Sequence, residues 1–160
     1  MSTSSKTIER ASGYEMLEMY EDAISELDTL PETVAGKAIV LAIRASCLIG
    51  LKRWEDARIV ATTCMNRFPN EAKGYIHLAF SLHELGKTEE ALVTLLAAPD
   101  NLENEVLFHY NLACYYCSLG RLGEARVSLL KAFAIDPTYR KSARKDTDLK
   151  ALWQELPYMI

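Results

Sequence analysis

Two columns of alanine recur every 34 residues along this 160-residue chain. One column is Ala11, Ala45, Ala79 and Ala113, and the other is Ala23, Ala57, Ala91 and Ala125. A fixed period of this length over most of a chain indicates stacked helical repeats, because each unit then buries its apolar face on its neighbours. The period therefore predicts an all-α solenoid of four helical hairpins, with units at 4–37, 38–71, 72–105 and 106–139.

Each unit is expected to be two amphipathic helices joined by a tight turn. In the third unit, residues 75–82 carry apolar side chains at helical spacing, and Gly86 then supplies a left-handed helix stop. Gly120 repeats this stop in the fourth unit, whereas Glu18 and Lys52 stand in its place in the first two. Small alanines at the helix crossings allow the two backbones of each pair to approach closely.

Prolines predict that the second helices alternate in length. Pro31 and Pro99 follow the Leu30 and Ala98 positions of the first and third units, and proline cannot continue a helix. The second helices of the other two units are expected to be longer, running on toward Pro69 and Pro137.

These columns resemble the tetratricopeptide repeat. The fourth unit matches that pattern best, through Asn111-Leu112-Ala113, Tyr116, Gly120, Glu124-Ala125, Ala132 and Asp136-Pro137. The resemblance implies a right-handed solenoid of the small bacterial type. It also implies that the first helices of the units line a concave groove that holds an extended or helical segment of a partner protein.

The two ends of the chain depart from the repeat. Residues 1–5 are rich in serine and threonine and are expected to be a disordered tail, with the four repeats occupying 6–137. Residues 138–160 are expected to form capping helices, whose inner face consists of Leu149, Leu152, Trp153 and Leu156. The string 146–152 resembles a segment that follows the last repeat in many bacterial tetratricopeptide proteins.

Composition narrows the class of partner. The net charge of −4 and pI near 5.4 argue against nucleic acid, which requires a strong basic stripe. The sequence has no apolar stretch of 18 residues, so we expect no membrane span. Four cysteines outside a small secreted scaffold suggest free thiols in a reducing compartment, and the cytoplasm is the expected location.

Placing the first helices on the family geometry gives a predicted groove. This predicted groove comprises Ile39, Ile43, Lys73, Ile76, His77, Phe80, His83, Glu84, Leu107, Tyr110, Asn111 and Cys114. The set is mostly apolar with a few polar side chains, as interaction surfaces often are. An alternative stays open for Ile39 and Ile43, which at helical spacing also fit packing beneath the first unit. A second alternative is that Asn111 bonds within its own repeat.

No residues indicate catalysis. The sequence has no glycine-rich phosphate loop and no Gly-x-Ser-x-Gly motif, so we expect no enzyme and no cofactor. His77, His83, Cys114 and Cys117 are the one group with metal-ligand chemistry, but their spacing is not that of a zinc finger, and we expect no metal.

The sequence favours a non-catalytic scaffold that binds a mostly apolar protein segment in its concave groove. Two alternatives remain. One is a chaperone for a secreted substrate, as in type III secretion. The other is a self-assembly module in which one copy packs on another, making a homo-oligomer.

Overall fold

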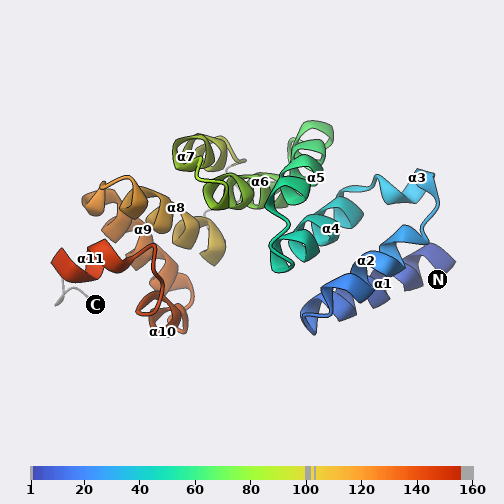
Figure 1. Ribbon diagram of the computed structural model, residues 1–160, viewed down its shortest axis with the longest axis horizontal. Coiled ribbons are helices and arrows are strands. Elements are labelled where there is room, and N and C mark those ends of the chain that lie inside the picture. The colour runs from blue at the N-terminus through green and yellow to red at the C-terminus, as the bar shows by residue number, and fades with distance from the viewer. Residues whose placement is uncertain (1, 100–101, 103, 156–160) are drawn as a thin grey trace.

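The chain is an elongated array of helix pairs, seen in a computed structural model that describes residues 2–99, 102 and 104–155 (Figure 1). The pairs are α1 (Thr3–Met16) with α2 (Tyr20–Asp28), α4 (Ala38–Gly50) with α5 (Trp54–Arg67), α6 (Ala72–Glu84) with α7 (Thr88–Leu96), and α8 (Val106–Ser118) with α9 (Leu122–Ile135). The short helices are α3 (Glu32–Ala35), α10 (Tyr139–Ala143) and α11 (Lys150–Glu155). No strand occurs in these ranges, which confirms the predicted all-α solenoid.

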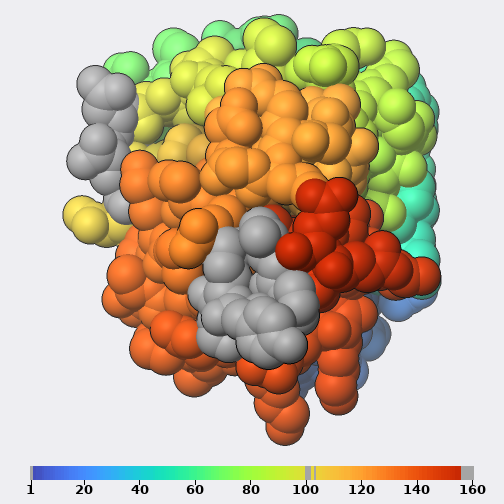
Figure 2. All heavy atoms as spheres, turned by 90° about the vertical axis from the view of Figure 1, so that its left-hand side faces the viewer, coloured from blue at the N-terminus to red at the C-terminus, as the bar shows by residue number. Residues whose placement is uncertain are grey.

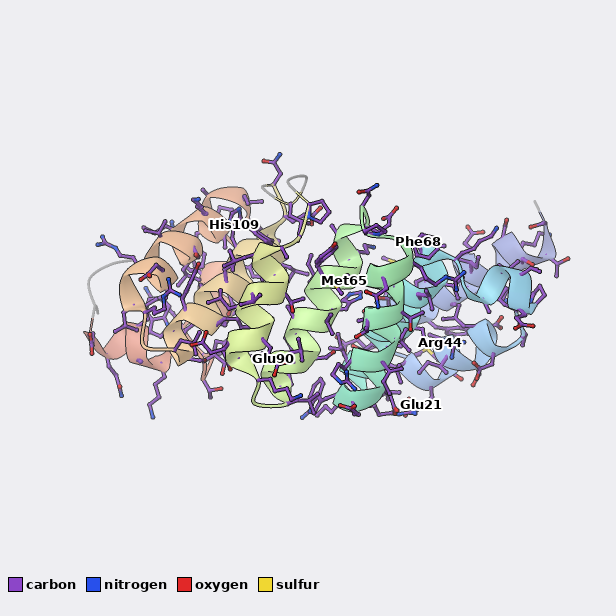
Figure 3. The ribbon with its side chains drawn as sticks, turned by 90° about the horizontal axis from the view of Figure 1, so that it is seen from above. Glu21, Arg44, Met65, Phe68, Glu90 and His109 are labelled. Carbon is purple, nitrogen blue, oxygen red and sulfur yellow. The ribbon has the colours of Figure 1, made fainter. Side chains whose placement is uncertain are left out.

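The alanine columns lie where the helices cross. All eight of these alanines are completely buried, at 0% exposure. The approach is closer still between α5 and α6, where a Cβ added to Gly74 would lie 2.9 Å from the backbone nitrogen of Met65. Met65 lies at this seam between the two helices (Figure 3). Small residues therefore set the spacing of the stack.

The four turns within the helix pairs share one backbone conformation. Gly86 and Gly120 have φ of 78° and 73°, as the sequence predicts for glycine stops. Glu18 and Lys52 adopt the same region at φ of 59° and 57°, although a Cβ makes it costly. The repeat geometry thus imposes the turn even where glycine is missing.

The second helices alternate in length as the prolines predict. α2 and α7 have 9 residues each, while α5 and α9 have 14. α3 then fills the link between α2 and α4.

The N-terminal end differs from the expected tail. α1 begins at Thr3, because the hydroxyl of Ser2 accepts a hydrogen bond from the Ser5 amide at 3.2 Å and so caps the helix. Residues 3–5 are therefore helical, and Met1 lies outside the described residues. The limits of the four repeats themselves remain a prediction.

The apolar core consists of two clusters. The smaller joins α1, α2 and α4 through residues such as Ala11, Leu27 and Ile43. The larger runs from α4 to α11 and ends on Leu149 and Leu152, which are fully buried. These two leucines take the inward positions predicted for the cap, whereas Leu156 lies outside the described residues.

Candidate functional site

The predicted groove residues do not form one open strip. Four of them are exposed: Ile39, Lys73, Glu84 and Leu107. Three are partly buried: His77, Phe80 and His83. The remaining five are buried: Ile43, Ile76, Tyr110, Asn111 and Cys114.

The C-terminal segment covers the far part of this face. The hydroxyl of Tyr110 on α8 donates a hydrogen bond to Oδ2 of Asp146 at 2.7 Å. Nε2 of His83 on α6 lies 3.1 Å from Oδ2 of Asp148. The thiol of Cys114 lies 3.9 Å from the same Asp146 oxygen. We call these five residues the C-terminal latch, because they hold the loop before α11 against the first helices.

The latch also brings together groups of the kind that bind metals. One ligand atom each from Cys114, Asp146 and Asp148 lies within 4.8 Å of the others. Burial and then the Asp146 charge raise the pKa of the Cys114 thiol. Burial, and then the bond to Asp146, likewise raise the pKa of Tyr110. These contacts favour an intramolecular hydrogen-bond network that fixes the end of the chain.

Three other predicted residues belong to the helix packing. Ile43 is 5% exposed and packs with the first unit, as the alternative interpretation held. Ile76 is 8% exposed and belongs to the larger core cluster. Asn111 is 7% exposed. Core and groove positions overlap at helical spacing, so periodicity alone does not separate them.

An open hollow lies at the beginning of α4 and α6. It has a volume of about 410 Å³ and is lined by Lys37, Ala38, Ile39, Ala42, Cys64, Glu71 and Lys73. Its apolar lining includes Ile39 and Ala42. Its charged lining consists of two cations, Lys37 and Lys73, and one carboxylate, Glu71. We call it the α4–α6 hollow. It unites two predicted groove residues, Ile39 and Lys73, that are far apart in sequence.

His77 and Phe80 lie further along α6. Burial, and then the charge of Lys73, lower the pKa of His77 to about 4, so its ring is neutral at physiological pH. Its Nδ1 is buried and has no hydrogen-bond partner among the described residues. Phe80 packs on Trp54 at a ring separation of 6.1 Å. Both side chains are therefore partly buried in the protein's own packing.

The outer face of the array carries exposed apolar residues as well. Val93 and Leu96 on α7 are 67% and 54% exposed, and Val127 on α9 is 55% exposed. A hollow of about 480 Å³ between them is lined by Leu96, Phe108, His109, Leu112, Tyr116, Gly123, Glu124, Val127, Ser128 and Lys131. This outer face is the rival binding surface for any partner.

Asp146 and Asp148 are the site residues that the sequence did not assign. Their signal was an Asp-x-Asp pair ahead of Leu149, which indicated an end cap. Asp146 accepts the Asp148 amide at 3.0 Å, a local turn typical of aspartate. Nothing local indicates that the outer oxygens contact Tyr110 and His83, which lie 36 and 65 residues away in the sequence.

Comparison with known proteins identifies the repeat and the fold. The family model for the tetratricopeptide repeat matches residues 107–139. No relative among the curated proteins matches the sequence.

Several solved structures share the fold across nearly the whole chain. MamA of AMB-1 has a TM-score of 0.70 at 15% identity, covering 97% of this chain and 88% of its own. TTC0263, a thermophilic TPR protein in Thermus thermophilus, has a TM-score of 0.73 at 21% identity, covering 91% and 79%. YrrB, described as a TPR protein with an unusual peptide-binding site, has a TM-score of 0.65 at 17% identity, covering 94% and 84%. At these identities the likeness establishes the fold.

Proposed function

We propose that this tetratricopeptide repeat protein is a non-catalytic scaffold that binds a partner segment in the α4–α6 hollow and along the open part of the first-helix face. The observation that carries the proposal is the division of this face. Its C-terminal part is filled by the latch, while its N-terminal part presents Ile39 and Lys73 beside a hollow of about 410 Å³.

The lining of the hollow suggests the chemistry of the segment. Ile39 is 47% exposed and offers apolar area, and Lys37 and Lys73 line the same hollow. An apolar side chain with a neighbouring aspartate or glutamate satisfies both features, since a carboxylate gains from cations at partly desolvated positions. The proposed ligand is therefore a mostly apolar segment with an acidic residue next to its anchor.

The state of the thiols supports the location that we propose for this function. All four cysteines are free and buried, and burial raises the pKa of Cys47 to about 11. Unreactive free thiols support a reducing, cytoplasmic location, which we include in the proposal. Within the described residues, no helix is long and apolar enough to cross a membrane.

Selection from a random peptide library on the immobilised protein tests the proposal. Selected peptides should combine apolar and acidic residues. Ile39→Asp and Lys73→Glu should each weaken their binding at least tenfold, which is about 1.4 kcal/mol. Val93→Asp, a change at a more exposed residue of the outer face, should leave the affinity within about twofold. Loss of binding in Val93→Asp alone would place the site on the outer face and reject the proposal.

The identity of natural partners separates scaffold from chaperone. A chaperone for a secreted substrate should keep that substrate soluble and release it during export, whereas a scaffold should remain bound to a folded partner. Measuring aggregation of a captured partner with and without the protein distinguishes the two.

A further inference from the structure

The two ends of the array carry opposite charge. Residues 11–36 contain seven carboxylates and no lysine or arginine. Residues 121–150 contain eight lysines and arginines against four carboxylates. The first segment holds the second half of α1 with α2 and α3, at one end of the molecule, and the other segment holds α9 and α10, at the opposite end (Figure 1). The net charge of −4 therefore conceals a strong polarity along the array.

The α1–α2 turn departs from the other three turns of the array. At the position of Met16 the other units have Gly50, Glu84 and Ser118. At the position of Met19 they have Arg53, Lys87 and Arg121. Met16 is 82% exposed, Leu17 70% and Met19 41%. We call residues 16–19 the head turn. It is an apolar tip at a position that the other units keep polar or small.

The missing cation leaves a carboxylate without its usual partner. Arg53, Lys87 and Arg121 each form an ion pair with the acidic residue three positions later, at 2.8, 4.0 and 2.8 Å. The equivalent acid in the first unit is Asp22, and Met19 cannot pair with it. Of the seven carboxylates in residues 11–36, Glu26 and Asp28 alone have a cation within 4 Å among the described residues. Glu21, in the first turn of the same helix, lies at the edge of the array (Figure 3).

The opposite end of the array carries a complementary hollow. It has a volume of about 360 Å³ and is lined by Arg144, Lys145, Asp146, Thr147, Lys150, Trp153 and Gln154. Trp153 is partly exposed, and its indole donates a hydrogen bond to the carbonyl of Ala143 at 2.9 Å, which fixes the ring. We call this site the tail hollow. α11, which supplies Lys150, Trp153 and Gln154 to this lining, lies on the end face seen in Figure 2.

The latch leaves Lys145 and Lys150 of the tail hollow without a carboxylate partner among the described residues. Asp146, which lines the hollow, and Asp148, two residues further on, are directed to Tyr110 and His83. Lys145 and Lys150 are exposed, and the described residues form no ion pair with either of them. The hollow thus offers an aromatic surface bordered by cations.

From these features we infer that the head turn of one copy docks in the tail hollow of a second copy. Methionine side chains contact the Trp153 ring, with which thioether sulfur interacts favourably. Glu18, at the centre of the turn, lies opposite Lys145 and Lys150. The contact joins two different surfaces, so it leaves a free head and a free tail at every step. The expected assembly is an open head-to-tail chain of copies. This inference involves the ends of the array and does not depend on the α4–α6 hollow.

Sedimentation velocity on the wild-type chain over a range of concentrations tests the inference first. The weight-average mass should rise with concentration at low salt. Raising NaCl from 0.05 to 0.5 M should weaken the association at least tenfold, because the charges are exposed and screened. A wild-type chain that stays monomeric up to millimolar concentration in 0.05 M NaCl would overturn the inference.

Two variants then identify the surfaces. Met16→Ser/Met19→Ser removes the apolar tip, and Lys145→Glu/Lys150→Glu reverses the charge of the tail hollow. All four residues are exposed, so each variant should keep the wild-type melting temperature. Each variant alone should be monomeric. Mixed together, they should form a one-to-one complex and nothing larger, because one intact tail remains to bind one intact head.

The mixed complex distinguishes a head-to-tail contact from other self-association. A symmetric contact, head on head or tail on tail, would leave one of the two variants associating alone. Val93→Ser and Leu96→Ser serve as controls on the outer face and should assemble like the wild type. Assembly that survives both end variants but is lost in these controls would assign the contact to the outer face and reject the inference.

Discussion

The hydroxyl of Tyr110 donates a 2.7 Å hydrogen bond to Asp146 and so joins the first helix of the last pair to the loop before α11. This bond is partly buried, and its acceptor is a carboxylate, so it should be stronger than an average neutral one. It determines how much of the first-helix face is closed by the chain itself.

Tyr110→Phe should destabilise the protein by about 1–3 kcal/mol, since it leaves a partly buried carboxylate oxygen without this donor. Tyr115→Phe is the matched control. The Tyr115 hydroxyl is buried and has no hydrogen-bond partner among the described residues, so its removal should be neutral or stabilise by up to about 1 kcal/mol. Urea unfolding of both variants measures the difference. Equal losses in the two variants would contradict the latch.

The left-handed turns predict opposite effects for glycine gain and loss. Gly120→Ala introduces a Cβ at φ 73° and should cost about 1–2 kcal/mol. Lys52→Gly relieves the same strain at φ 57° and should stabilise by up to about 1 kcal/mol, after the added entropy of the unfolded chain. Thermal unfolding of the two variants gives the sign. A more stable Gly120→Ala would show that the turn conformation is not the constraint.

Overpacking a helix crossing should be costly. Ala125 is fully buried in a column of alanines, so Ala125→Leu should destabilise by about 1–3 kcal/mol. Val127→Leu adds bulk to the same helix at a position that is 55% exposed, and it should change stability by less than about 0.5 kcal/mol. If the two variants melt at the same temperature, the alanine column is not at the crossing.

His77 should make stability depend on pH. Its pKa rises from about 4 in the folded protein to its ordinary 6.5 when the chain unfolds. Between these values the unfolded state binds more protons, so the free energy of unfolding should fall as the pH is lowered from about 6.5 to about 4. The His77 contribution is fully present above pH 6.5 and amounts to at most about 3 kcal/mol.

Urea unfolding at several pH values, in the wild type and in His77→Gln, measures this contribution. The variant cannot titrate at this position, so its stability should vary less over the same pH range. Identical slopes for the two proteins would show that His77 is not held neutral by burial.

The alanine columns, the turns and the helix lengths were predictable because each depends on local spacing. Ala23 and its counterparts recur at one period, and Pro31 and Pro99 end helices by their own chemistry. The latch was not predictable, because Asp146 reaches Tyr110 through the path of the chain after α10 and no periodic pattern encodes that path. Ile43 shows the same limit within a helix. It lies one turn after the exposed Ile39, so helical spacing puts both residues on one face, yet Ile43 belongs to the core.

The central claim is that the open N-terminal part of the first-helix face binds a partner segment while the latch keeps the C-terminal part closed. Backbone amide shifts in an NMR titration with a library-selected peptide test it most directly. The account predicts that the largest shifts fall at Ile39, Lys73 and neighbouring residues of α4 and α6, with Tyr110 and Cys114 unchanged. Shifts centred on Val93 and Val127, or on Tyr110 with release of Asp146, would contradict it.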